Sequence, residues 1–356
     1  MCMYFTKGIN QDGYIMCLHC NMKKYEHLIF SYIYNITFQC DDIVLLIQEY
    51  IKVDDYNNIA CGYEHSIVLL KDNTVKCWGN NKYGQCKVPD SIQGKVVSIN
   101  CGYYHSVALL NDNTVECWGD NSDGQCNVPD SIRGNNHNVN INNDNVVGKV
   151  VSINCGGYYS CALLNDNTIK CWGNNSYGQC KVPDSIQGKV VSINCGGYHL
   201  TALLNDNTIK YWGNNEYEYG QCNVPDSIQD RIISMSCGSI HTIALLNNNT
   251  VRCWGDNGSG QCNVPDSIQG KVVSISSGGF YSGALLNNKT VKCWGDNMYG
   301  QYNVPDSIQG KVISISCGYY HSVALLNDNT IKCWGDNVYG QCNVPDFIQK
   351  NIMRKN

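Results

Sequence analysis

The chain has 356 residues, a formal net charge of −5 at neutral pH and a pI near 5.9. It contains no run of basic residues, so neither nucleic acid nor an anionic membrane is an expected partner. No apolar stretch reaches the roughly 18–20 residues that span a bilayer, and the first residues lack the charged, apolar and small-residue order of a signal peptide. We therefore expect a soluble, intracellular protein of the cytoplasm.

Residues 1–55 precede the regular part of the chain and are expected to contain one helix, near residues 41–51. Asp41 or Asp42 is suited to cap its first turn. Apolar side chains then recur at i, i+3, i+4 and i+7 between Ile43 and Tyr50, which is the pattern of one helical face. The rest of this segment shows no clear period.

From residue 56 to residue 349 one unit, represented by Val96–Ile132, recurs in seven copies. Its tryptophans are spaced by 40, 54, 40, 42, 40 and 40 residues, and its prolines are similarly regular. A fixed period of this size indicates a solenoid, a propeller or another array of stacked units. The tryptophans are Trp78, Trp118, Trp172, Trp212, Trp254, Trp294 and Trp334, and the prolines are Pro89, Pro129, Pro183, Pro225, Pro265, Pro305 and Pro345.

The unit has the pattern of short β-strands. Val96–Cys101 alternates between apolar and polar residues, with Val97 and each second residue after it expected on the buried face. Ser106–Leu110 is apolar on both faces, and Val115–Trp118 is expected as a third strand. Three or four antiparallel strands per unit, repeated seven times, predict an all-β, seven-bladed β-propeller, because a ring leaves only short, protected edges. An open β-solenoid is the alternative.

Two positions of the predicted hairpin carry further information. An asparagine suited to positive φ ends each Asn-Asp-Asn-like turn, and Lys289 replaces it in the sixth copy, where we expect strain. A charged residue stands in the third strand of every copy, which is typical of a solvated outer edge. The asparagines are Asn73, Asn113, Asn167, Asn207, Asn249 and Asn329, and the charged residues are Lys76, Glu116, Lys170, Lys210, Arg252, Lys292 and Lys332.

The regular pattern is interrupted in a few places. An asparagine-rich insertion at residues 134–147 separates the second and third copies and is expected to be a mobile loop. The fourth copy has two extra residues within Glu216–Tyr219. The first strand of the first copy is weakened by Asn57 and Asn58, so the C-terminal tail, residues 350–356, is hypothesised to pair near it and help to close the ring.

The chain has 23 cysteines, and 18 of them occupy three positions of the repeat. Most are expected to be compact buried hydrophobes. The sixth copy lacks the first and third cysteines together, as Ser277 and Tyr302, so we predict that these two positions touch within a blade, with a disulfide as a further hypothesis. The first position holds Cys61, Cys101, Cys155, Cys195, Cys237 and Cys317; the second holds Cys77, Cys117, Cys171, Cys253, Cys293 and Cys333; the third holds Cys86, Cys126, Cys180, Cys222, Cys262 and Cys342.

No metal or cofactor site is expected. The repeats contain no Cys-x-x-Cys, and the lone Cys17–Cys20 pair in the N-terminal segment is weak evidence for zinc. A histidine or tyrosine recurs near the start of the second strand, once per copy, and is interpreted as a hydrogen-bonded structural group. These residues are His65, His105, Tyr159, His199, His241, Tyr281 and His321.

The position just before these histidines and tyrosines is variable but mostly aromatic, and it lies in a predicted loop. If the side chains project from one face, they form an aromatic ring suited to protein binding; packing between blades is the other interpretation. The chain shows no nucleophile–base pair, phosphate loop or close carboxylate pair, so we do not expect an enzyme. The candidate partner-binding residues are Glu64, Tyr104, Tyr158, Tyr198, Ile240, Phe280 and Tyr320.

The segments Cys101–Leu110 and Trp118–Gln125 resemble the regulator of chromosome condensation repeat, in its short form of about 40 residues. The resemblance covers about residues 56–346 and implies a seven-bladed propeller. It also implies a protein-interaction module or scaffold, with guanine nucleotide exchange on a small GTPase as an alternative. A basic chromatin-binding tail is not visible, so a chromatin role is not expected. Because Asp41–Ile51 faintly resembles the first helix of an F-box, a ubiquitin-ligase substrate adaptor is a second alternative.

Overall fold

The structure is a computed structural model, and it describes residues 58–133, 148–214, 220, 224–225, 228, 231–346 and 348. The helix expected at 41–51, the insertion at 134–147 and the tail at 350–356 lie outside these residues. All described residues belong to one compact unit, Asp54–Asn356.

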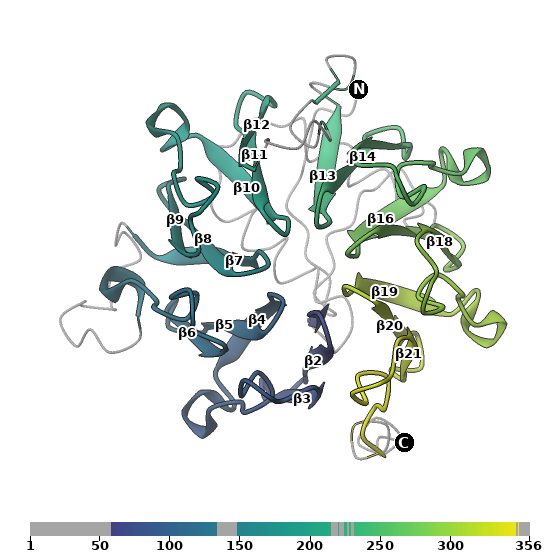
Figure 1. Cartoon of the computed structure of the whole chain (residues 1–356), viewed down its shortest axis with the longest axis horizontal. Coiled ribbons are helices and arrows are strands. Elements are labelled where there is room, and N and C mark those ends of the chain that lie inside the picture. Colours follow the sequence, from purple (N-terminus) through teal and green to yellow (C-terminus); the bar gives the residue numbers. More distant parts are fainter. Residues whose placement is uncertain are drawn as a thin grey trace, which may run out of the picture. The chain divides into compact units, whose positions relative to one another are not determined.

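The described chain forms seven three-stranded antiparallel sheets, so each repeat supplies three strands and no fourth strand is assigned there. The sheets are arranged radially around a centre, which confirms the predicted seven-bladed propeller (Figure 1). The strands are β1 (Asn58–Cys61), β2 (His65–Leu69), β3 (Val75–Gly79), β4 (Val96–Cys101), β5 (His105–Leu110), β6 (Val115–Gly119), β7 (Val150–Cys155), β8 (Tyr159–Leu164), β9 (Ile169–Gly173), β10 (Val190–Cys195), β11 (His199–Leu204), β12 (Ile209–Gly213), β13 (Ile232–Cys237), β14 (His241–Leu246), β15 (Val251–Gly255), β16 (Val272–Ser277), β17 (Tyr281–Leu286), β18 (Val291–Gly295), β19 (Val312–Cys317), β20 (His321–Leu326) and β21 (Ile331–Gly335).

Burial follows the sequence pattern within each blade. The middle strand, such as β5, is buried along its whole length, as expected for a segment that is apolar on both faces. The first strand lines the central channel, and the third is the outer strand that carries the charged position (Figure 1). Five short 3-10 helices each begin directly after a proline of the repeat. They are Asp90–Ile92, Asp130–Ile132, Asp184–Ile186, Asp266–Ile268 and Asp306–Ile308.

The expected alternation in the first strand is partly wrong. Ile99 and Cys101 are buried, but Val97 is exposed and Val96 is buried in its place. A register shift between Val96 and Ser98 explains the difference, because an extra residue in one strand turns the side chains before it to the other face.

Neighbouring blades are joined by a closed circuit of backbone hydrogen bonds around the channel. In each blade the residue after the first glycine donates its N–H to a carbonyl of the next blade, at 3.0–3.3 Å. Tyr319 of the last blade donates to Gly62 of the first at 3.1 Å, so the circuit is complete. The other six bonds run from Tyr63 to Tyr103, Tyr103 to Gly157, Gly157 to Gly197, Gly197 to Gly238, Ser239 to Gly279 and Gly279 to Tyr319.

In six repeats a glutamine carbonyl near the end of the repeat, among the described residues, forms a second joint with the following blade. The Gln85 carbonyl accepts a hydrogen bond from the Trp118 indole at 2.9 Å and from the Ser106 hydroxyl at 3.2 Å. At the closure, Gln341 receives the same two bonds from Trp78 and Ser66 of the first repeat. Both tryptophans are buried against apolar side chains, so the seam between blades is apolar as well as hydrogen-bonded.

The histidines form a third joint and are structural, as predicted. The Nε2 of His65 lies 3.1 Å from the Ser106 hydroxyl of the next blade, and His105 is placed in the same way on Ser160 at 2.9 Å. Because the Ser106 hydroxyl donates to the Gln85 carbonyl, it accepts from Nε2–H. The Nδ1 atom is buried with no hydrogen-bond partner among the described residues, so the ring is neutral and carries its proton on Nε2.

Burial lowers the pKa of His65, His105, His241 and His321 to about 3, and that of His199 to about 4. The folded state therefore binds fewer protons than the unfolded state between about pH 6.5 and pH 3. Above this window the histidines are neutral in both states, and they do not lower the free energy of unfolding. As the pH falls through the window, the unfolded state takes up protons that the folded state cannot, so the free energy of unfolding decreases.

We predict a marked loss of stability between pH 7.5 and pH 5, before most carboxylates titrate. At pH 5.5 each buried histidine should cost about 1.4 kcal/mol of unfolding free energy. Urea unfolding monitored by tryptophan fluorescence at several pH values measures this loss.

Two repeats supply a matched control, because Tyr159 and Tyr281 replace the histidine and bond to the next blade through their hydroxyls. His105→Tyr should fold and should reduce the loss at pH 5.5 by about 1.4 kcal/mol. An unchanged pH dependence would show that the histidine is not the acid-sensitive group.

The positive φ predicted for the last residue of each hairpin turn is confirmed. The six asparagines have φ between 60° and 66°, and Lys289 adopts φ 64° in the sixth copy. A long side chain without a local hydrogen-bonding group is disfavoured in this left-handed region.

Lys289→Asn should therefore stabilise the protein by about 0.5–1 kcal/mol, with Asn329→Lys as the reverse substitution in an equivalent turn. Chemical denaturation of the two variants measures both effects. Equal stability of all three proteins would argue that the turn is not strained.

The predicted contact between the first and third cysteines is wrong. The third cysteine instead contacts the second cysteine of its own repeat, on the adjoining third strand. The sulfur atoms are 2.8 Å apart for Cys77 and Cys86, 2.7 Å for Cys117 and Cys126, and 2.9 Å for Cys171 and Cys180. In the fifth repeat Cys253 and Cys262 form a disulfide.

Candidate functional site: a tyrosine face at one mouth of the channel

The candidate residues come together because of a bond that recurs in every blade. Each lies in the turn between the first and second strands, and its carbonyl accepts the N–H of the residue that follows Trp-Gly after the third strand. Asp120, for example, donates to Tyr104 at 2.9 Å. The turns and the loops after the third strands therefore share one end of the propeller, and we call this surface the tyrosine face. The other pairs are Asn80 with Glu64, Asn174 with Tyr158, Asn214 with Tyr198, Asp256 with Ile240, Asp296 with Phe280 and Asp336 with Tyr320.

The aromatic residues of this face contact one another. The rings of Tyr104 and Tyr158, from adjacent blades, have centroids 6.2 Å apart. Loop tyrosines extend the cluster outward, since Tyr83 lies 5.2 Å from Tyr104 and Tyr299 lies 4.6 Å from Tyr320. All seven candidate residues are half-buried, so each packs against its neighbours and still presents part of its surface to solvent.

Three tyrosines at the centre of the face were not among the residues predicted from the sequence. Tyr63, Tyr103 and Tyr319 follow the first glycine of their repeats and lie inside the ring of candidate residues. The rings of Tyr63 and Tyr319 stack at 4.2 Å, and Tyr103 lies 5.6 Å from Tyr63 and 5.3 Å from Tyr319. Together they cover one mouth of the central channel, whose lining includes Tyr103 and Tyr319.

The other blades accommodate these rings by carrying small residues at the same position. The Tyr103 hydroxyl crosses to Ser239, with the two oxygens 2.9 Å apart. A Cβ on Gly157 would lie 2.7 Å from the Tyr103 ring, and one on Gly279 would lie 2.9 Å from the Tyr319 ring. The signal was available in the sequence as three tyrosines against three glycines and one serine at equivalent positions.

Below this mouth the channel is narrow and polar. It encloses a cavity of about 270 Å³, lined by first strands and by the glycine turns. The Asn154 amide bridges two blades there, donating to the Ile193 carbonyl and accepting from the Cys195 N–H. The asparagine and serine residues that line it are Asn100, Asn154, Asn194, Ser236, Ser239, Ser276, Ser277 and Ser316.

The tyrosine face is acidic as well as aromatic. Among the described residues of its turns and of the loops between the third strands and the prolines of the repeat, the cations are Lys82, Lys87 and Lys181, and Lys82 lies over the Tyr83 ring at 5.3 Å. Glu64 accepts a hydrogen bond from the Asn80 amide at 2.6 Å. Burial raises the pKa of the Glu64 carboxyl, and the negative charge of Asp336 nearby acts in the same direction. The carboxylates are Glu64, Asp120, Asp123, Asp256, Asp296 and Asp336.

The phenols of Tyr63, Tyr103 and Tyr104 remain neutral across the physiological range. Burial raises the pKa of Tyr104 to about 12, with the Glu64 charge adding to the effect, and it raises the pKa of Tyr63 and Tyr103 further. The face therefore offers hydroxyl donors and ring faces beside fixed carboxylates.

Within the described ranges, no three His, Cys, Asp or Glu side chains are grouped so that they could hold a metal ion. None of the helices described is both long enough and apolar enough to pass through a bilayer.

Comparison with solved structures identifies propellers over most of the chain. The ectodomain of the receptor kinase CR4 from Physcomitrella patens matches 79% of this chain and 74% of its own, with a TM-score of 0.60 and 22% identity. Prp20p from Saccharomyces cerevisiae, described with its binding to Gsp1p and histones, matches 76% of this chain and 82% of its own, with a TM-score of 0.59 and 18% identity. At these identities the likeness shows the fold alone.

Curated relatives match only in part. The X-linked retinitis pigmentosa GTPase regulator homolog of Caenorhabditis elegans is 26% identical over 136 residues, which is 35% of this chain and 10% of the relative. The probable E3 ubiquitin-protein ligase HERC4 of Homo sapiens is 63% identical over 27 residues, which is 8% of this chain and 3% of the relative. The chain thus spans a tenth or less of the length of these relatives.

The family profile of the regulator of chromosome condensation (RCC1) repeat matches seven times, once in each blade. The matched residues are 57–85, 96–125, 150–179, 190–221, 232–261, 272–301 and 312–341. These segments make up more than half of the chain and coincide with the structural repeats. The chain belongs to the regulator of chromosome condensation (RCC1) repeat family.

Proposed function

We propose that this protein is an interaction module that binds a protein partner through the tyrosine face. The observation that supports this best is the continuous cluster of partly exposed tyrosines over one mouth of the channel. Tyr83, Tyr299 and Tyr339 are 44%, 43% and 51% exposed at its outer edge. Tyrosine gives a large contact area with few rotatable bonds, which is why it is frequent among residues that dominate binding energy.

The face is also prepared for binding before a partner arrives. Its turns are held by the bonds to the loops, and its central rings are fixed by mutual stacking. Little side-chain freedom is therefore lost on association, and this favours affinity.

The charge of the face favours a partner with basic side chains. Six carboxylates and three lysines are present in its described turns and loops, so the face carries a net negative charge. Arginine or lysine side chains could pair with the carboxylates and lie over the tyrosine rings. Acidic proteins and nucleic acids would be repelled by the same charges.

We predict that substitutions on this face weaken partner binding at least tenfold. Tyr104→Ile and Tyr339→Ser are suitable because Ile240 and Ser259 stand at the equivalent positions of other repeats, so folding should be preserved. Affinity capture from cells of the source organism, followed by calorimetry with the purified partner, measures the loss.

Val151→Ser and Val191→Ser provide the control. They remove exposed apolar side chains at the start of β7 and β10, at the far end of these strands from the tyrosine face. Partners that bind all variants equally well would contradict the assignment of this face.

Guanine nucleotide exchange is the second candidate, and it rests on the shared fold with Prp20p. A panel of small GTPases loaded with fluorescent nucleotide separates the two proposals. A scaffold leaves nucleotide release unchanged, whereas acceleration at micromolar protein that Tyr104→Ile abolishes would establish exchange through the same face. The short match to a ubiquitin ligase gives no comparable support for a ligase adaptor.

A further inference from the structure

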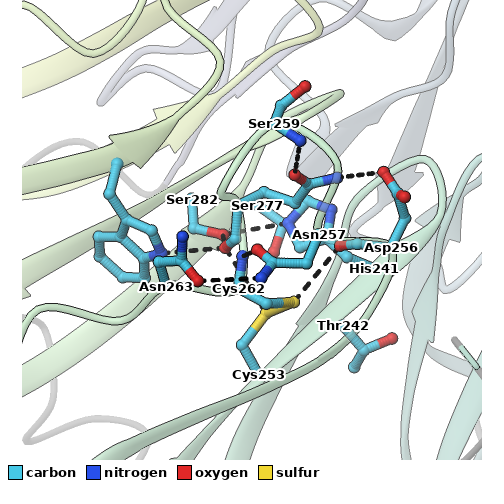
Figure 2. The surroundings of a disulfide bond; sticks show 12 residues. His241, Thr242, Cys253, Asp256, Asn257, Ser259, Cys262, Asn263, Ser277 and Ser282 are labelled. Carbon is cyan, nitrogen blue, oxygen red and sulfur yellow. Dashed lines mark hydrogen bonds between the residues drawn. A yellow bond between two sulfur atoms is a disulfide. The ribbon is translucent and has the colours of Figure 1, made fainter.

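A pair of cysteines connects the third strand of a blade to the loop that follows it. The second cysteine lies in the strand and the third lies nine residues later, at the end of the loop. In the fifth repeat this pair is a disulfide, with the Cα atoms of Cys253 and Cys262 5.0 Å apart (Figure 2). That separation is within the usual range for disulfides, so the backbone of this repeat accommodates the bond.

The same backbone is present in repeats whose sulfurs are not bonded. In the first three repeats the two sulfur atoms are 2.7–2.9 Å apart. All six of these cysteines are half-buried, so they are not sealed inside the core. Cys333 and Cys342 occupy the equivalent positions of the last repeat and are half-buried as well.

The loop holds its shape without the disulfide. In the fifth repeat the Cys262 N–H donates to the Asn257 side chain, whose amide in turn donates to Asn263 (Figure 2). In the sixth repeat Tyr302 replaces the third cysteine, and its N–H donates to Asn297 in the same way. An asparagine side chain therefore positions the third residue whether or not a sulfur is present, and the pair can be reduced or oxidised on the same backbone.

We infer that these cysteine pairs are sites of reversible thiol–disulfide exchange, which take up oxidising equivalents from small disulfides such as oxidised glutathione. One thiolate attacks the small disulfide and releases one reduced glutathione. The second thiolate then attacks the mixed disulfide and releases another, so two thiols and one disulfide become one protein disulfide and two glutathione thiols. The sites are Cys77–Cys86, Cys117–Cys126, Cys171–Cys180, Cys253–Cys262 and Cys333–Cys342.

Oxidation would affect both the contacts between neighbouring blades and the tyrosine face. The loop closed by Cys77 and Cys86 contains Tyr83 of the face, and it contains Gln85, whose carbonyl accepts bonds from the next blade. A cross-link restricts the conformations of this loop in the unfolded chain and so lowers the entropy of the unfolded state. The folded state, with its contact between blades, becomes more stable relative to it.

Two repeats provide internal controls because each lacks one member of the pair. The fourth has Tyr211 at the second position, and the sixth has Tyr302 at the third. Cys293 of the sixth repeat contacts Cys317 of the next repeat, and both thiols are buried away from glutathione, so Cys293 should stay reduced. In the third repeat Cys171 also lies 2.9 Å from the buried Cys161, which could compete with Cys180. Cys161→Val removes this competitor and introduces the residue found at Val107.

The test is peptide mapping of the whole chain after equilibration with defined ratios of reduced and oxidised glutathione. Because burial raises the pKa of Cys342 to about 12, long equilibration at mildly alkaline pH is needed. Free thiols are trapped by alkylation during denaturation, and linked peptides are identified by mass spectrometry. We expect the five within-repeat links to form as the oxidised fraction rises, to disappear on reduction, and to leave Cys293 alkylated.

Free thiols at the five pairs under fully oxidising conditions, or links that join cysteines of different repeats, would overturn the inference. Thermal unfolding provides an independent measurement on the same samples. The Tm should rise by about 4 °C for each link formed, and the double variant Cys117→Ser with Cys126→Ser should lose one such increment. An oxidised protein with all five links and an unchanged Tm would contradict the stabilising role.

Discussion

The structure depends on the joint between each blade and the next. A single three-stranded sheet cannot bury its own apolar face, so its side chains complete a cluster with the following sheet. The clusters accordingly contain residues of two repeats, as where Leu69 and Val75 pack with Ile99 and Trp118. The Gln85 carbonyl, bonded to Trp118 and Ser106, fixes the spacing of that joint. The six glutamine joints among the described residues add polar contacts to a seam that is otherwise apolar.

Much of this arrangement could be predicted from the sequence, because the relevant signals are local. Strand alternation and the hairpin asparagines concern residues close together in the chain, and the tryptophan period shows that this local unit recurs seven times. Two expectations failed because they depend on backbone geometry that the pattern of residue types does not reveal. Val97 is exposed because of a bulge, which the apolar pattern does not reveal. The cysteine partners were inferred because one repeat lacks the first and third cysteines at the same time. The geometry of the loop instead brings Cys86 to Cys77.

The candidate site was predicted in part for the same reason. The ring of turn residues follows from equivalence between repeats, since one position in every blade must lie at the same end of the propeller. The central tyrosines depend instead on contacts between non-adjacent blades, such as Tyr103 with Ser239. Such contacts become visible only once the radius of the channel is known.

The three tyrosines at the mouth remove the rotational equivalence that seven similar blades would otherwise provide. Tyr319, Tyr63 and Tyr103 come from three consecutive blades around the closed ring, and the remaining blades carry small residues beneath their rings. A symmetric rim would let a ligand settle in any of seven equivalent rotations. This rim has a bulky sector and an open sector, so a bound protein would be held in a single angular register.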